Sequence, residues 1–465
     1  MLDINDRSDL PLATPPDQTG DRLRPTEPDG NRLADEAIGE TAHPSDDSDE
    51  SADEGETERG DHAPSQSAGY AVIATGTLVV LASTLLAPAI PQLTSHFEST
   101  QSNASGSGGW ASPDLLAKMM ITAPAIVVGV LSLAGGWLLD RIGRRVVLLA
   151  GIVLFGLAGG IGGVLTSPAA LIGSRVVFGF GVAGILLASS TLIGDYYDGR
   201  KRQQMLGRQI AAIAVVSTAG MFLAAWLVQT FSWRWPFAIY LLALPMLPWA
   251  WKTVEEPEID DEEDEADSGD GSIPWATISL IYAASFFALA IFHLATTQVP
   301  TYLDELGYGS VYMTALVVSI ISVCGVPSSL LFQKARDRFS NQTLLVAVFA
   351  VGAVGFLIAG VYESIATLCL GLAVFGTLYG FRTPAFNAWL FNAAPAAYRG
   401  RLVGGMTACC FFGIFASPLL SNPLRDAIGM PYVILVAAGL QAAFAGAFFY
   451  FAIARRKDDE AEATD

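Results

Sequence analysis

Charged residues are scarce and unevenly placed in this chain of 465 residues. They make up 15% of the sequence, whereas hydrophobic residues make up 52%, a balance typical of polytopic membrane proteins rather than soluble ones. Of the 45 acidic residues, 35 lie in three segments, 1–68, 255–270 and 458–465. Because these segments lack the apolar residues that a packed core needs, we expect them to be disordered. The net charge of −19 therefore describes two tails and a linker, and it does not indicate a ligand.

Cysteine is also rare, and the sequence motifs of enzymes are missing. The four cysteines, Cys324, Cys369, Cys409 and Cys410, all lie in apolar stretches, which predicts packing residues rather than disulfides or metal ligands. There is no His-Glu-x-x-His motif, no nucleophile elbow and no phosphate-binding loop. We therefore expect a protein that is not an enzyme, uses no cofactor or metal, and binds no nucleic acid.

Long apolar runs dominate what remains. A helix needs about 20 mostly apolar residues to cross a bilayer, and twelve runs meet this requirement. They are roughly 70–93, 115–138, 146–166, 170–193, 209–230, 235–252, 274–299, 312–333, 343–361, 365–391, 404–421 and 430–453. The acidic segment at 255–270 falls between the sixth and the seventh run. The sequence thus predicts an all-α membrane protein with twelve transmembrane helices in two groups of six.

Lysine and arginine predict the orientation of these helices. They are concentrated in the connections after even-numbered runs, whereas the connections after odd-numbered runs offer only Arg234 and Arg425. Because cytoplasmic loops carry the excess of basic residues, we expect both termini and the linker to be cytoplasmic. The expected organisation is an acidic tail, a six-helix bundle, an acidic linker, a second six-helix bundle and a C-terminal tail, at 1–68, 69–252, 253–272, 273–454 and 455–465.

The two groups of runs resemble each other in sequence. At an offset of 197 residues, Asp140-Arg141 coincides with Asp337-Arg338, and Arg202 coincides with Arg399. Repeats of this size are a hallmark of transporter folds. We therefore expect the two groups to be pseudo-repeats.

A ten-residue motif closes the second run. It reads Gly136-Trp-Leu-Leu-Asp140-Arg141-Ile-Gly143-Arg144-Arg145, and it resembles the G-x-x-x-D-R-x-G-R-R signature of major facilitator transporters. Gly136 would allow close helix contact, and Asp140 could accept hydrogen bonds from a nearby arginine or a helix N-terminus. The resemblance implies the major facilitator fold and a latch for one conformation of the transport cycle. Simple anchoring by positive charge explains the arginines but not the Gly-Asp-Gly spacing.

The second copy of this motif is degenerate. Asp337 and Arg338 remain, but Gln333 stands at the glycine position and Ser340-Asn-Gln342 replaces the Gly-Arg-Arg end. We expect weaker latching on that side.

The fourth run contains an intramembrane arginine, Arg175. Its surroundings resemble the family motif R-x-x-q-G-x-g, with Phe178 in place of the glutamine. A charged residue at mid-membrane costs at least ~2.5 kcal/mol, so we expect Arg175 to face the cavity, and the resemblance implies a role in proton coupling. Snorkelling to the outer interface is the alternative. The glycines at 179, 181 and 184 predict close packing against neighbouring helices.

Other polar residues in the apolar runs are candidates for substrate binding or coupling. Arg382 lies in the tenth run, His293 lies in the seventh, and Asp114 and Lys118 mark the outer end of the second, whereas no Asp or Glu lies in the middle of a run. This favours neutral or anionic substrates, with Arg382 and Arg175 as anion partners. His293 is a candidate proton relay or a packing residue. Further candidates, which line a cavity or join helices, are Gln298, Tyr379 and Asn387.

Two segments of the second half resemble a drug-efflux-like branch of the family. The first is Thr297-Gln298-Val-Pro300-Thr-Tyr302-Leu. The second is Arg399-Gly-Arg-Leu-Val-Gly404-Gly, with Ser417-Pro418-Leu-Leu further on. We therefore expect a secondary active transporter of the cell membrane that exports apolar or drug-like compounds by alternating access, coupled to protons. The alternative is uptake or exchange of a small organic or inorganic anion bound by the intramembrane arginines. The expected partners are a small-molecule substrate, protons and the lipid bilayer, with the chain acting as a monomer.

Overall fold

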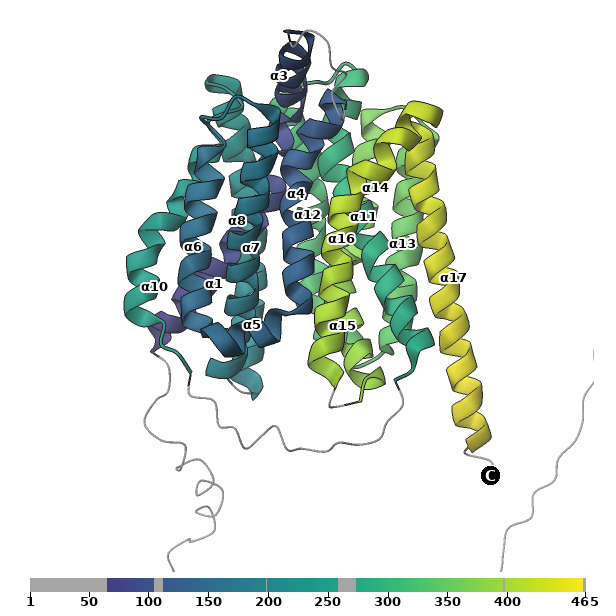
Figure 1. The fold of residues 1–465 in the computed structure, drawn as a ribbon. Helices are drawn as coiled ribbons and strands as arrows, with labels where there is room; N and C mark the ends of the chain where they lie inside the picture. The colour runs from purple at the N-terminus through teal and green to yellow at the C-terminus, as the bar shows by residue number, and fades with distance from the viewer. Residues whose placement is uncertain (1–64, 104–111, 198, 258–272, 396–397, 463–465) are drawn as a thin grey trace, which may run out of the picture. The chain divides into compact units, whose positions relative to one another are not determined.

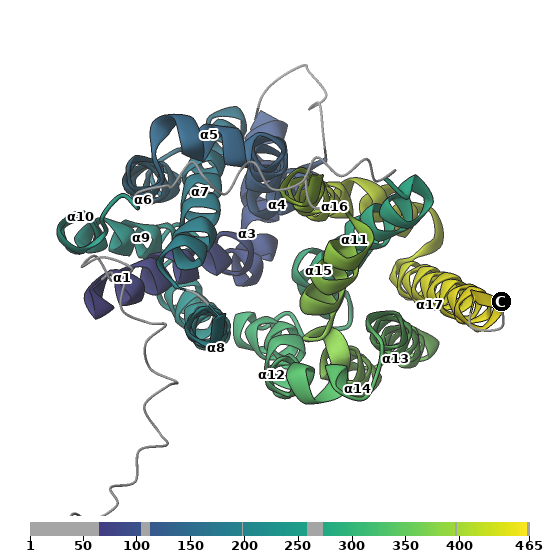
Figure 2. The same cartoon turned by 90° about the horizontal axis from the view of Figure 1, so that it is seen from below.

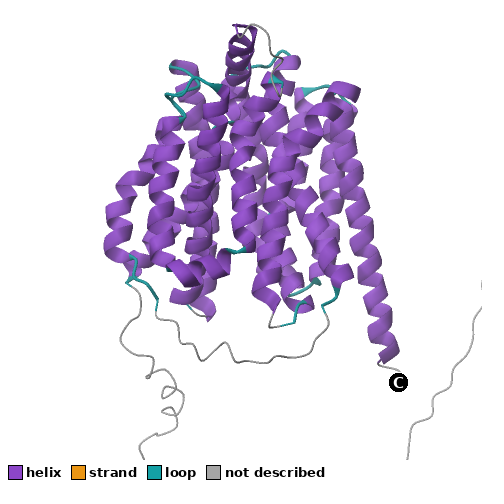
Figure 3. Cartoon of the chain, in the orientation of Figure 1, coloured by secondary structure: helices purple, strands orange, loops and turns teal. Residues whose placement is uncertain are grey.

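The protein folds as helices joined by short connections in the computed structural model (Figure 3). The structure describes residues 65–103, 112–197, 199–257, 273–395 and 398–462, and within these ranges no strand occurs. The described residues belong to one compact unit, and all sites below lie in it. Most of the two segments predicted to be disordered, 1–68 and 255–270, lies outside the described ranges, but residues 66–68 already belong to a helix.

The helices before the linker are called the first bundle (Figure 1). They are α1 (Gln66–Thr77), η1 (Leu78–Val80), α2 (Leu81–Thr84), η2 (Ala87–Ala89), α3 (Ile90–Asn103), α4 (Pro113–Leu133), α5 (Gly135–Ile142), α6 (Arg144–Ile161), α7 (Pro168–Tyr196), α8 (Gly199–Thr230), α9 (Phe237–Tyr240), η3 (Leu241–Met246) and α10 (Leu247–Thr253).

The helices after the linker are called the second bundle (Figure 1). They are α11 (Trp275–Glu305), α12 (Val311–Arg336), α13 (Asn341–Val361), α14 (Ile365–Tyr379), α15 (Arg382–Ala393), α16 (Arg399–Ile428) and α17 (Met430–Glu462). The last helix continues beyond the expected end of the twelfth span at residue 453. The disorder predicted for the C-terminal tail is therefore wrong for residues 458–462, which are helical.

Eleven helices in the described ranges are long and apolar enough to cross a membrane. The expected sixth span, 235–252, is not among them because it is divided into α9, η3 and α10. Pro245 lies inside η3, and Pro248 lies in the first turn of α10. Proline has no backbone N–H to donate and clashes with the preceding turn, which accounts for the irregular helix. Twelve spans therefore stay a prediction.

The main contacts between the bundles are those of α4 with α16 and of α8 with α12, as Figure 2 shows along the helix axes. Within the first bundle, α7 packs on both α4 and α6. Glycines make these contacts close, as predicted: a methyl group on Gly179 would lie 2.8 Å from the Pro124 carbonyl oxygen, and one on Gly184 would lie 3.1 Å from that of Val147.

Helix boundaries recur at the same spacing as the sequence motifs. The starts of α6 and α13, and those of α7 and α14, are each 197 residues apart. This agreement supports the proposed pseudo-repeat, which stays a proposal.

Candidate functional site

A break in the expected tenth span places two candidate residues at helix ends. α14 ends at Tyr379, and α15 begins at Arg382. At the break, the Gly380 backbone N–H donates to Ser328 Oγ of α12 at 3.1 Å. A methyl group on Gly380 would lie 2.6 Å from the Gly325 carbonyl oxygen, so only glycine allows this approach. Interrupted helices often form the binding sites of transporters.

Arg382 is a nearly buried cation, 8% exposed. Its Nη2 donates to Thr383 Oγ1 at 2.9 Å, and its guanidinium lies 5.0 Å from the centre of the Tyr379 ring. Its Nε has no partner among the residues that the structure describes. It forms no ion pair with any residue of the described ranges. The guanidinium therefore keeps donors that are free to bind a ligand.

Side chains of α11 and α16 surround this cation. The Tyr379 ring stacks on Phe292 of α11, with centroids 4.5 Å apart, and the neighbouring His293 is close enough for the charge of Arg382 to act on it. Cys410 of α16 lies beside both Arg382 and Ser285. We call Ser285, His293, Tyr379, Arg382 and Cys410 the Arg382 cluster.

Several polar atoms of the Arg382 cluster are buried without a partner in the described part of the chain. They are Ser285 Oγ, His293 Nε2, Tyr379 Oη and Arg382 Nε. A buried polar group left unpaired costs about 1–3 kcal/mol, so a polar ligand that pairs with them would offset that cost. With one cation, two hydroxyl groups and no carboxylate, the cluster is suited to an anion. Asn387 lies further along α15, and its Oδ1 is also unpaired.

Gln298, which also belonged to the predicted cavity, lies in a different network. Its Oε1 accepts from Lys118 Nζ of α4 at 2.7 Å, and its Nε2 donates to Asn422 Oδ1 of α16 at 2.6 Å. Asp114 and Arg425 complete this network, which we call the Asp114 cluster. The structure therefore divides the predicted binding residues between two sites.

Arg175 is fully buried within the first bundle and neither snorkels nor pairs with the second bundle. Its Nη2 donates to the Gly159 carbonyl of α6 at 2.9 Å. The rings of Phe178, Phe237 and Tyr240 lie 4.7–5.4 Å from its guanidinium. Cation–π contacts of this kind stabilise a desolvated charge. Its Nε and Nη1 have no partner in the described ranges. The role of Arg175 in coupling stays a prediction.

The predicted latch motif forms a cluster at the α5 end of the first bundle. Asp140 Oδ1 accepts from Arg144 Nη2 at 3.0 Å, and Asp195 of α7 accepts from Arg144 Nε at 2.9 Å. Arg141 lies over the Trp137 ring at 5.4 Å. The close helix contact expected at Gly136 is absent, since no atom lies within 4 Å of its added methyl group; Gly135 makes such a contact instead, with Leu187.

Gly143 and Arg145 of the motif help to hold the start of the linker. Gly143 has a φ of +94°, a conformation that favours glycine, and it turns the chain from α5 into α6. Beyond it, the Glu256 carboxylate accepts from the backbone N–H groups of Arg144 at 2.5 Å and Arg145 at 2.8 Å. A carboxylate at a helix N-terminus pairs with free donors and complements the helix dipole. The motif therefore binds a segment of its own chain.

The second copy of the motif lacks these contacts. Asp337 and Arg338 are exposed and form no ion pair within the described ranges. A polar cleft of about 240 Å³, lined by Arg336, Asn341 and Asn392 among others, lies where α13 begins. This agrees with the weaker latching expected there, which stays a prediction.

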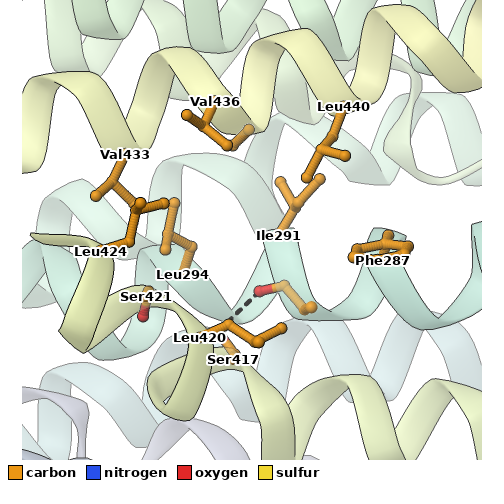
Figure 4. Close-up of a pocket in the computed structure, with 12 residues that line it drawn as sticks. Phe287, Ile291, Leu294, Ser417, Leu420, Ser421, Leu424, Val433, Val436 and Leu440 are labelled. Carbon is orange, nitrogen blue, oxygen red and sulfur yellow. Dashed lines mark hydrogen bonds between the residues drawn. The ribbon is translucent and has the colours of Figure 1, made fainter. Parts of the chain in front are cut away.

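An apolar pocket of about 80 Å³ lies between α11, α16 and α17 (Figure 4). Phe287, Ile291, Leu294, Val433 and Leu440 help to line it, and Ser417 donates to the Ala290 carbonyl at its edge at 2.8 Å. It contains no charged side chain, so it is suited to an apolar ligand and not to an anion.

Sequence reasoning missed the partners that complete these sites. Asn422 and Arg425 lie more than 300 residues from Asp114, and Glu256 lies in an acidic run without periodicity. The only sequence signal for Asn422 was a polar residue near the end of an apolar run, and such residues are common. Nothing in the sequence distinguishes Glu256 from its acidic neighbours.

Comparisons with known proteins agree with this architecture. Residues 72–418 match the Major Facilitator Superfamily. The chain is 24% identical to a protein named as a proline/betaine transporter of Staphylococcus haemolyticus over 63% of the chain and 68% of that protein. It is 25% identical to the cis,cis-muconate transport protein of Acinetobacter baylyi over 65% of the chain and 78% of that protein. The inward-open xylose transporter XylE of E. coli has the same fold, with a TM-score of 0.68 at 16% identity over 82% of this chain and 95% of that one.

The match to the family covers most of the chain, and the helices that it covers are apolar enough to cross a membrane. The predictions that the chain is a membrane transporter and not an enzyme are confirmed. This chain belongs to the Major Facilitator Superfamily and is a multi-pass membrane protein that transports a small molecule.

Proposed function

We propose that the chain is a secondary active transporter that carries small organic carboxylates across the cell membrane by alternating access. The observation that carries this proposal is Arg382, a buried cation without an acidic partner in the described ranges, beside unpaired hydroxyl and imidazole groups. Proline, betaine and muconate, which appear in the names of the two relatives, all contain a carboxylate. This choice favours the anion alternative of the sequence analysis over drug efflux.

Export of apolar compounds is the second candidate function. The apolar pocket beside α17 favours it. Matches to two fungal proteins named as efflux transporters, however, extend over only 22–23% of the chain. They support this candidate less than the longer matches support carboxylate transport.

The membrane arrangement belongs to the same proposal. The excess of basic residues after even-numbered spans supports cytoplasmic termini, a cytoplasmic linker and a cytoplasmic α5 end. In this arrangement the two bundles rock about the Arg382 cluster, and the chain acts as a monomer. The contacts of Asp140 and Arg144 stabilise the first bundle at the cytoplasmic end.

The proposed coupling ion is the proton, carried by His293. Its Nδ1 lies 3.1 Å from the Leu289 carbonyl oxygen, so in the neutral ring Nδ1 must be the donor and Nε2 carries the free lone pair. Nε2 has no partner in the described ranges. A proton can bind there while a carboxylate binds Arg382.

The test is transport by purified protein in proteoliposomes. Benzoate, muconate, proline and betaine are compared with benzamide and with an apolar organic cation, for the wild type and for Arg382→Leu. We expect transport of one or more carboxylates, reduced at least about tenfold in the variant because the anion loses its cation.

A control variant and the contrary outcome complete this test. Arg234→Leu removes an arginine outside the Arg382 cluster, which caps the Gly163 and Leu165 carbonyls and lies over the Trp233 ring. This variant should keep its KM for the carboxylate. If benzamide or the cation is transported, and at the same rate by Arg382→Leu as by the wild type, the result contradicts the proposal and favours efflux.

A further inference from the structure

The Asp114 cluster holds a carboxylate in a set of converging donors. Asp114 Oδ2 accepts from Lys118 Nζ at 2.6 Å and from Asn422 Nδ2 at 2.9 Å, and it forms an ion pair with Arg425 Nη2 at 3.1 Å. Its Oδ1 accepts from Thr301 Oγ1 at 3.4 Å. Charged donors of this kind bind carboxylates more strongly than neutral ones do.

Most of these donors belong to the other bundle. Asp114 and Lys118 lie on α4, whereas Thr301 lies on α11 and Asn422 and Arg425 lie on α16. When the two bundles separate at this end, Asp114 must therefore leave three of its four donors. Those donors would then face the space that opens.

The cluster also contains more positive than negative charge. Lys118 is completely buried and Arg425 is largely buried, while Asp114 is the carboxylate that both contact. Asp426 approaches Arg425 at 3.4 Å, but its side chain is 67% exposed, so it lies at the rim. Buried cations need an anionic or strongly polar partner. Without Asp114, the cluster would retain two cations with no buried carboxylate.

Lys118 also contacts the second bundle. Gln298 Oε1 accepts from its Nζ at 2.7 Å, and Asn422 Oδ1 accepts from it at 3.0 Å. Gln298 is fixed in turn by Ser421 Oγ at 2.5 Å. In the closed state the lysine therefore has partners in the second bundle besides Asp114, and it loses them when this end opens.

We propose that the Asp114 cluster is a second carboxylate site, which Asp114 occupies when this end is closed and the substrate occupies when it is open. The inference rests on the proposed carboxylate transport. Asp114 is a carboxylate of the chain that competes with the substrate for Arg425, Asn422 and Thr301. While the substrate is bound there, Asp114 cannot return and this end stays open until the substrate leaves the cluster. Opening of this end is thereby coupled to the presence of substrate.

The test measures benzoate binding to the full-length protein in detergent by calorimetry, with Arg382→Leu present in every variant to remove the first site. Asp114→Ala empties the donors, and we expect it to bind benzoate about tenfold more tightly than Arg382→Leu alone. Adding Arg425→Gln should abolish that gain. Asp426→Asn, which removes the rim carboxylate, should produce no gain and serves as the matched control.

Two results would overturn the inference. They are no gain in benzoate affinity for Asp114→Ala, or a gain that persists with Arg425→Gln. If Asp114→Ala does not fold, Asp114→Asn gives the same comparison with an isosteric side chain. If Asp114→Ala and Asp114→Asn give no gain in benzoate binding, but the single variant Arg382→Leu still loses carboxylate transport, only the second site is rejected. If benzoate and the other carboxylates are not transported by the wild type, the proposed function fails instead.

Discussion

His293 is the residue whose surroundings best explain how proton and substrate could be coupled. The charged group beside it is Arg382, and the other titratable groups of the cluster are Tyr379 and Cys410. Protonation at Nε2 places a second cation next to the guanidinium, which is unfavourable in a medium of low dielectric. A bound carboxylate removes this repulsion. Proton and carboxylate should therefore bind together.

This argument predicts the effect of His293→Gln. A glutamine side chain can still donate to the Leu289 carbonyl but cannot take up a proton near neutral pH. We expect carboxylate binding to persist while substrate-driven alkalinisation of the medium and stimulation by an inward pH gradient are lost. The matched control is His96→Gln, which replaces another histidine with an unpaired buried Nε2 outside the cluster. An unchanged pH gradient response in His293→Gln would reject the relay.

Glu256 gives a second prediction for a single residue. Its carboxylate pairs with two backbone N–H groups at the start of α6, whereas Glu255 contacts Tyr196 only through its backbone. Because Glu256 is exposed, we expect Glu256→Gln to lower the free energy of unfolding by only about 1 kcal/mol. Glu255→Gln should have no measurable effect. Thermal unfolding of both variants in detergent tests this difference.

Sequence reasoning found residues that are rare in their surroundings and missed residues that are ordinary in theirs. Arg382 and His293 stand out because charged or titratable groups in apolar runs are costly. Arg425 lies at the end of a span, where basic residues are common. In the sequence it therefore bears only on the orientation of the helices in the membrane. Its position beside Asp114 depends on how α4 and α16 pack, which no local pattern records.

At the level of secondary structure, the pattern of apolar runs predicted most helices, but the interruptions required the structure. The run at 365–391 reads as one span, yet it is divided after Tyr379 because Gly380 packs against α12. The run at 235–252 is divided by its prolines. Hydropathy averages over such breaks, and one of them positions Arg382.

The break at Gly380 can be tested directly. In Gly380→Ala the added methyl group would lie 2.6 Å from the Gly325 carbonyl oxygen, so α12 and α14 must move apart. We expect a loss of stability of about 1–3 kcal/mol and a higher KM for the carboxylate, because Arg382 begins the next helix. Gly439→Ala on α17, where nothing lies within 4 Å of the added methyl group, should change neither. An unaltered KM in Gly380→Ala would show that the break does not position Arg382.

For the whole molecule, the contact between α4 and α16 is the feature that alternating access must change. The Asp114 cluster joins these helices at one end, and Gly404 packs against the Ser132 carbonyl near the other end. Both ends are therefore in contact within this pair of helices. Interfaces of this kind have discrete arrangements rather than a continuous range. An added methyl group that separates the helices at one end should therefore shift the population between the two open states.

Gly404→Ala adds such a methyl group at the proposed cytoplasmic end. Its methyl group would lie 2.7 Å from the Ser132 carbonyl oxygen, whereas one on Gly400 of the same helix would meet nothing within 4 Å. Separation of α4 and α16 there favours the state open to that side. A bias of about 1.4 kcal/mol corresponds to a tenfold shift in population. We therefore expect Gly404→Ala to bind carboxylate more tightly from the cytoplasmic side, more weakly from outside, and to transport it more slowly. Gly400→Ala should match the wild type in oriented proteoliposomes. If Gly404→Ala binds carboxylate equally tightly from both sides of the membrane, the contact between α4 and α16 does not control which side is open.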